Sequence, residues 1–138
     1  MACLVSYAYP YAQILYLGLV PGSPAWPQLG QLLVVVAAGL SLASLLTLGR
    51  WFGIRPALRG LAQTGPYRLV RHPLYLAYIL ADIGVNCAEW NGGTVLLTAG
   101  GWASLLYRIQ AEERLLAQDA GWTAYGRAVH FRLLPGLW

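Results

Sequence analysis

Long apolar segments alternate with short polar ones along this chain. Four apolar segments can be delimited, at about residues 3–20, 29–49, 73–89 and 92–109. Segment 29–49 has no charged residue and is long enough to cross a membrane as a helix. The pattern therefore predicts an all-α, polytopic membrane protein with about four transmembrane helices.

The four segments differ in regularity. Segment 3–20 is interrupted by Pro10, and the loop that follows it, 21–28, is rich in helix breakers. The last two segments are short and carry polar residues, which is typical of spans that line a cavity or pack on neighbouring helices through small residues.

Helical character continues beyond the fourth segment, through EERLLAQ into DAGWTAYGRAV. Leu115, Leu116, Trp122 and Tyr125 give this stretch an apolar side, which predicts a C-terminal interfacial helix lying on the membrane surface. The absence of repeats or linkers indicates a single domain over residues 1–138, with the most distinctive motifs in 58–138.

Composition and charge support a membrane location. The chain is 58% hydrophobic and 10% charged, too apolar to cover its own surface in water. Its arginines fall only in 50–71 and 108–132, which predicts that both termini face the cytoplasm across an inner or plasma membrane. This clustering argues against a nucleic-acid-binding stripe. Tryptophans lie at segment ends, as in an interfacial belt: Trp26, Trp51 and Trp90.

Cysteine and histidine positions exclude some chemistry. Cys3 and Cys87 fall near opposite membrane faces in this topology, so we expect no disulfide between them. His72 and His130 have no neighbouring Cys or His at metal-ligand spacing. No basic n-region precedes the first apolar segment, so we expect no cleaved signal peptide.

Two polar clusters abut the predicted spans and indicate one site at the membrane surface. The first is TGPYRLVRHPLY, residues 64–75, where Gly65-Pro66 predicts a turn and Pro73 a helix start. The second comprises Arg108, Glu112 and Glu113. On a helix, Arg108 and Glu112 share a face, whereas Glu113 points about 100° away.

These clusters allow an ordinary and a functional interpretation. In the ordinary interpretation, Arg108 and Glu112 form a surface ion pair worth about 0.3–0.5 kcal/mol. In the functional interpretation, the glutamate carboxylate binds a ligand's ammonium group and the arginine binds an anionic group. His72 fits a helix cap or a catalytic group. With the aromatic side chains, the set suits a zwitterionic ligand with an aromatic ring, such as S-adenosylmethionine, although chemistry alone does not select it.

TGPYRLVRHPLYLAY, then RIQAEERLL, then GWTAYGRAVHFRLLPG, resembles the integral-membrane methyltransferases that include isoprenylcysteine carboxyl methyltransferases and phospholipid N-methyltransferases. The resemblance covers about residues 58–138. It implies S-adenosyl-L-methionine as cofactor and a lipidic or prenylated small-molecule acceptor. It also implies these cofactor-binding residues: Arg59, Gly60, Leu61, Ala62, Tyr67, His72, Pro73, Leu74, Tyr75, Glu112 and Glu113.

The same resemblance implies a catalytic role for Arg108 in substrate engagement. An amine or thiol acceptor must first lose a proton, and His72 or a glutamate is the candidate to assist as a catalytic group. Ala77 stands where the family usually has glycine, and its methyl could crowd a close backbone approach. Two alternatives stay open. One is an NADPH-dependent, sterol-reductase-like enzyme, which shares the R-H-P-x-Y segment, and the other is a non-catalytic membrane scaffold. The acceptor and the oligomeric state also stay open.

Overall fold

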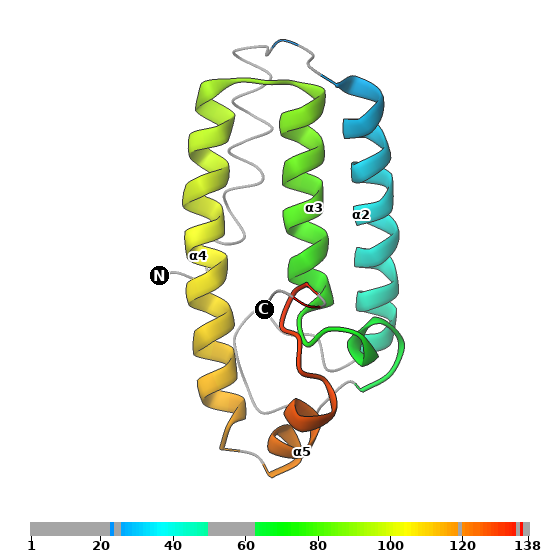
Figure 1. Ribbon diagram of the computed structural model, residues 1–138, viewed down its shortest axis with the longest axis vertical. Coiled ribbons are helices and arrows are strands. Elements are labelled where there is room, and N and C mark those ends of the chain that lie inside the picture. Colours follow the sequence, from blue (N-terminus) through cyan, green and yellow to red (C-terminus); the bar gives the residue numbers. More distant parts are fainter. Residues whose placement is uncertain (1–22, 24–25, 50–62, 119, 135, 137–138) are drawn as a thin grey trace.

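The computed structural model describes residues 23, 26–49, 63–118, 120–134 and 136. Within these residues the chain is all-helical and contains no strand. The elements are α2 (Pro27–Leu48), the 3₁₀-helix η2 (Gly65–Arg68), α3 (Pro73–Ala88), α4 (Gly92–Leu116) and α5 (Ala120–Ala128). The helices α2, α3 and α4 run side by side, and η2, α5 and the C-terminal tail gather at one end of them (Figure 1).

The predicted segments 29–49, 73–89 and 92–109 correspond to α2, α3 and α4. Segment 3–20 lies outside the described residues. Among the described helices, only α2, with 22 residues, is long and apolar enough to cross a membrane by length and composition, and α3 is a shorter apolar helix of 16 residues. The number of spans therefore stays a prediction. The helix α4 continues to Leu116, past the predicted end of its span.

Helices α2 and α3 touch backbone to backbone, at Gly30 of α2 and Gly84 of α3. A Cβ atom added at Gly30 would lie 2.5 Å from the carbonyl oxygen of Gly84, and one added at Gly84 would lie 2.8 Å from that of Gly30. Small residues permit this approach, as they do between helices in membranes. The contact fixes α3 against α2.

We expect Gly30→Ala to destabilise the fold by about 1–3 kcal/mol, because the new methyl group overlaps backbone atoms that cannot rotate away. Gly39→Ala, in the same helix, is the matched control, since a Cβ at Gly39 meets nothing within 4 Å. The thermal unfolding midpoint in detergent measures both. Equal midpoints for the two variants would contradict the close packing.

Helices α3 and α4 are joined by hydrogen bonds between buried or half-buried polar side chains. The Asn86 amide nitrogen donates to Thr98 Oγ1 at 2.9 Å, and Thr94 Oγ1 donates to Asn86 Oδ1 at 3.0 Å. Nearer the middle of α3, Trp102 Nε1 donates to Asp82 Oδ2 at 2.8 Å. The prediction that segment 73–89 packs on a neighbouring helix through small residues is confirmed by the contact of Gly84 with Gly30, and these polar side chains add a second contact, with α4. Each group satisfies another, as burial requires.

The tryptophans predicted at segment ends are exposed where the structure describes them. Trp26 precedes α2 and Trp90 lies between α3 and α4, both strongly exposed. Trp51 lies outside the described residues. Trp90 also exchanges two backbone hydrogen bonds with Ser23, which ties the chain before α2 to the α3–α4 connection.

The predicted C-terminal helix exists as α5, but its apolar side faces the protein. Trp122, Tyr125 and Val129 form a buried cluster, and the Tyr125 hydroxyl donates to the carbonyl oxygen of Tyr67 at 2.7 Å. Burial raises the pKa of Tyr125 to about 12, although the nearby Arg71 charge opposes this. The expectation that these aromatic residues lie on the membrane is therefore wrong. They hold α5 against the turn before α3.

Candidate functional site

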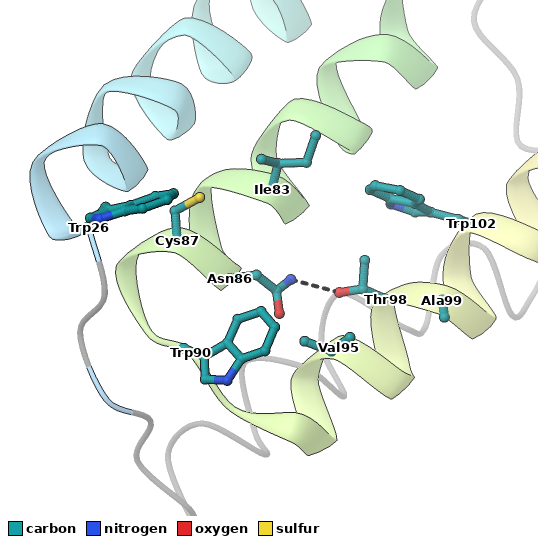
Figure 2. A pocket seen from close by; sticks show the side chains of 9 residues that line it. All are labelled: Trp26, Ile83, Asn86, Cys87, Trp90, Val95, Thr98, Ala99 and Trp102. Atoms are coloured by element: carbon teal, nitrogen blue, oxygen red, sulfur yellow. Dashed lines mark hydrogen bonds between the residues drawn. The ribbon is translucent and has the colours of Figure 1, made fainter.

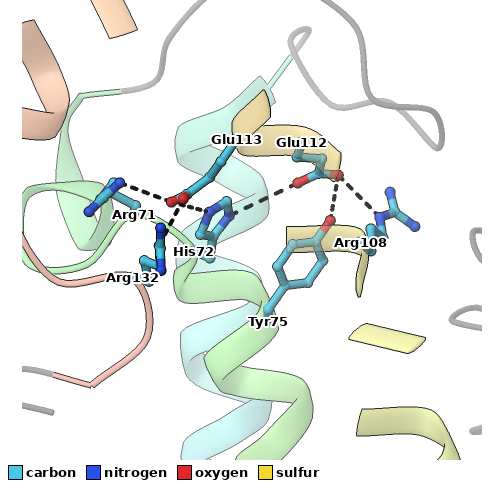
Figure 3. A network of polar contacts seen from close by, with 7 residues as sticks. All are labelled: Arg71, His72, Tyr75, Arg108, Glu112, Glu113 and Arg132. Carbon is cyan, nitrogen blue, oxygen red and sulfur yellow. Dashed lines mark hydrogen bonds and ion pairs between the residues drawn. The ribbon is translucent and has the colours of Figure 1, made fainter. Parts of the chain in front are cut away.

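The two polar clusters of the sequence meet at one end of the helices. The first turn of α3, the last turns of α4 and the C-terminal tail converge there (Figures 1 and 3). We call the following residues the charged cluster: Arg71, His72, Tyr75, Arg108, Glu112, Glu113 and Arg132. Beneath it lies a core in which Tyr75 packs with Leu105, Ile109 and Leu133.

The start of α3 holds His72 in place through its backbone. Pro73 occupies the first turn, where its missing N–H costs no hydrogen bond. The N–H groups of Arg71 and His72 donate to the carbonyl oxygens of Phe131 and Arg132, each at 2.9 Å. His72 occupies the N-cap position of α3, as the cap interpretation predicts, but its side chain makes no capping hydrogen bond. Its ring lies between the two glutamates instead (Figure 3).

Glu113 binds three basic side chains. Arg71 Nη1 donates to its Oε1 at 2.9 Å, Arg132 Nε donates to its Oε2 at 2.7 Å, and His72 Nε2 lies 3.4 Å from Oε1. Burial by itself raises the pKa of Glu113, but the hydrogen bond and charge of His72 and the charges of both arginines outweigh it and lower the pKa. Glu113 lies beyond the predicted span 92–109, and it is an ionised structural partner for these bases.

Glu112 has different partners, as its direction on the helix predicts. Its Oε1 accepts hydrogen bonds from the Tyr75 hydroxyl at 2.6 Å and from Arg108 Nε at 3.1 Å. Its Oε2 lies 4.0 Å from His72 Nδ1. Because the Arg108 side chain is only 3% exposed, the ordinary interpretation as a solvent-exposed ion pair is wrong. Arg108 is therefore buried, and Glu112 is half-buried beside it.

Aromatic rings border the cluster on two sides. The His72 and Tyr75 rings stack with centroids 5.5 Å apart, and the Trp122 ring is tilted against His72 at 6.4 Å. The guanidinium of Arg108 lies over the Tyr75 ring at 5.6 Å, and that of Arg71 lies 6.0 Å from the Trp122 ring centroid. Flat rings beside both acids and bases give the site the mixed chemistry expected from the sequence.

Other residues predicted for the site are close to it or outside the described chain. Tyr67 is buried beside α5, and burial, followed by the proximity of Tyr125 and Glu112, raises its pKa. Pro73 and Leu74 are buried in the first turn of α3. Arg59, Gly60, Leu61 and Ala62 lie outside the described residues. Ala77 is fully buried in α3, and the effect of its methyl on the site stays a prediction.

Two residues of the charged cluster were not predicted as site residues. Arg71 belongs to the basic region 50–71, from which the sequence predicts the membrane topology, and Arg132 belongs to the C-terminal tail. Both bind Glu113. The only sequence feature that pointed to Arg132 is its position in the tail sequence FRLLPG. The distance along the sequence between the tail and α3 does not show that the two segments meet.

Comparison with known proteins gives one family. No curated protein and no solved structure matches the chain. A family model, described as the isoprenylcysteine carboxyl methyltransferase (ICMT) family, matches residues 30–118, which is more than half of the chain. The match runs from α2 to the end of α4 and includes every residue of the charged cluster except Arg132. The resemblance to this methyltransferase family is thus confirmed, and the chain belongs to the isoprenylcysteine carboxyl methyltransferase family.

Proposed function

We propose that this protein transfers a methyl group from S-adenosylmethionine to a membrane-partitioned acceptor, the carboxylate of an isoprenylcysteine, and that the charged cluster is its cofactor site. The family is one of methyltransferases. The site assignment rests on the different partners of the adjacent residues Glu112 and Glu113. Glu113 pairs with Arg71 and Arg132 and contacts His72, whereas Glu112 accepts hydrogen bonds from Tyr75 and Arg108 with one oxygen, and its second oxygen lies 4.0 Å from His72 Nδ1.

The residues of the cluster fit the amino-acid end of this cofactor. Glu112 would bind the ammonium group through a charge-assisted hydrogen bond. Within the described residues, Arg71 Nε is buried and has no hydrogen-bond partner, so it would supply a donor for the carboxylate. The rings of Tyr75 and Trp122 would offer flat surfaces for the adenine. Arg59–Ala62 stay proposed as further cofactor-binding residues, together with Tyr67, Pro73 and Leu74.

Bound S-adenosylmethionine would supply an electrophilic methyl group, which the acceptor's nucleophilic atom would take by in-line displacement, with the neutral thioether S-adenosylhomocysteine as the leaving group. The main task of the protein is then alignment and exclusion of water. A carboxylate acceptor is already ionised at neutral pH, so no base is required. We assign Arg108 to the acceptor's carboxylate. We keep His72 for assistance to an acceptor, such as an amine, that must first lose a proton.

We also propose that the charged cluster faces the cytoplasm across an inner or plasma membrane. The arginines of the described chain lie on η2, at the start of α3, near the end of α4, on α5 and in the tail, which all gather at the cluster's end (Figure 1). Such one-sided placement is what the positive-inside rule describes. A soluble cofactor would reach the cluster from water, and the acceptor from the bilayer.

Calorimetric titration of the detergent-purified protein tests the cofactor. We expect saturable binding of S-adenosylhomocysteine and none of NADPH. Binding of NADPH alone would favour the reductase alternative, and binding of neither ligand by folded protein would favour the scaffold.

Methyl transfer then identifies the acceptor. With S-adenosylmethionine labelled on its methyl group, we expect label in an amine-blocked S-farnesylcysteine and not in phosphatidylethanolamine. The reverse result would assign the site to a phospholipid amine and give His72 a role as base.

A further inference from the structure

A cavity of about 480 Å³ lies between α3 and α4, at the opposite end of these helices from the charged cluster (Figure 2). Ile83 and Cys87 of α3 face Val95 and Ala99 of α4 across it, and Trp26 also contributes to its wall. This volume lies within the usual range of small-molecule sites, about 300–1,000 Å³. The cavity is large enough for a ligand and distinct from the site described above.

The wall of the cavity is almost entirely apolar. Three of its polar side chains already have hydrogen-bond partners: Asn86 donates to Thr98, and the Trp102 indole donates to Asp82 behind the wall. These groups therefore offer little to a polar ligand, and leaving a ligand's polar atoms unpaired here would be costly. The chemistry of the wall selects a hydrocarbon.

The position of the cavity indicates the source of that hydrocarbon. The wall includes the exposed Trp26 and Trp90, and exposed tryptophans at helix ends are typical of the membrane interface. The charged residue described at this end is Glu89, which is exposed, whereas the described arginines lie toward the charged cluster. A headgroup at this interface would meet a carboxylate and no described arginine, which disfavours anionic lipids.

We propose that this cavity binds one acyl chain of a zwitterionic phospholipid from the leaflet opposite the charged cluster. The headgroup would lie at the level of Trp26 and Trp90, and the chain would fill the space between α3 and α4. The proposal rests on the membrane placement given above. It does not depend on the proposed methyl transfer, and its tests do not measure activity.

Native mass spectrometry tests it on the full-length protein, released from nanodiscs of equal phosphatidylethanolamine and phosphatidylglycerol. Wild type should retain one phosphatidylethanolamine, and Ala99→Phe, which fills the cavity, should retain at least tenfold less. Ala103→Phe is the matched control, because Ala103 is exposed on the same helix outside the cavity. It should retain lipid as wild type does. Equal retention by Ala99→Phe, or preferential retention of phosphatidylglycerol, would overturn the proposal.

Alkylation of Cys87 provides a second test that needs no cavity-filling variant. The chain has two cysteines, so Cys3→Ala leaves Cys87 alone. Adding phosphatidylethanolamine to the detergent-purified protein should slow its reaction with a maleimide at least fivefold, and phosphatidylglycerol should slow it less. An unchanged rate would overturn the proposal. Release of the bound phospholipid by S-farnesylcysteine would also overturn it, because the cavity would then belong to the acceptor.

Discussion

Glu112→Gln should weaken the binding of S-adenosylhomocysteine by about 2–5 kcal/mol, roughly 30-fold or more, the usual cost of removing one partner from a buried charge pair. The side-chain amide oxygen of the new glutamine can still accept hydrogen bonds from Tyr75 and Arg108, so we expect the local structure to be retained. What is lost is the negative charge opposite the ligand's ammonium. Calorimetric titration in detergent measures the change.

Glu89→Gln is the matched control for that experiment. Glu89 is an exposed carboxylate just past the far end of α3, so its replacement changes the net charge equally without touching the charged cluster. Its affinity should equal that of wild type. Thermal unfolding establishes that both variants are folded. Wild-type affinity in folded Glu112→Gln protein would remove Glu112 from the cofactor site.

The sequence predicted the described helices well because their limits are set by local chemistry. Pro73 begins α3 as predicted, and α2 coincides with an uncharged apolar segment. Packing of segment 73–89 through small residues was predicted, but the sequence did not show that Gly30 and Gly84 are the residues that meet. A glycine in an apolar helix has the same sequence signature whether it faces lipid or another backbone, as Gly39 and Gly30 show.

The site was predictable where its residues are neighbours on one helix. The Arg108–Glu112 pair and the different direction of Glu113 follow from helical geometry. The meeting of His72 with both glutamates spans some forty residues. The placement of both polar clusters beside predicted spans indicated one site, and the family resemblance supported it. The docking of the tail on Arg71 and His72 uses backbone hydrogen bonds, which leave no signature in residue types.

The orientation of α5 shows a further limit. An apolar side on a helix predicts that this side is shielded from water, but the pattern does not distinguish shielding by lipid from shielding by the rest of the protein. Trp122 and Tyr125 pack inside the protein. The Tyr125 hydroxyl has a backbone partner in Tyr67, which a ring lying in lipid would lack.

Glu113→Gln should have the largest effect on stability, about 3–5 kcal/mol, because it removes the one carboxylate that Arg71, His72 and Arg132 share. Arg71 and Arg132 would then lie beside His72 without the carboxylate that balances their charges. We expect the tail to detach from α3 and the unfolding midpoint to fall. Arg114→Gln is the control, since Arg114 is adjacent and exposed and its replacement should change the midpoint little.

The pH dependence of the Glu113→Gln effect gives an independent check. The pKa of Glu113 is lower in the folded protein than its ordinary value, because the three bases outweigh the effect of burial. Its stabilisation is therefore complete at pH above the ordinary carboxyl range, and it is lost as pH falls through the folded value. The difference in unfolding midpoint between wild type and Glu113→Gln should shrink in acid. A difference that stays constant from neutral to acidic pH would show that Glu113 stabilises the fold by packing and not by its charge.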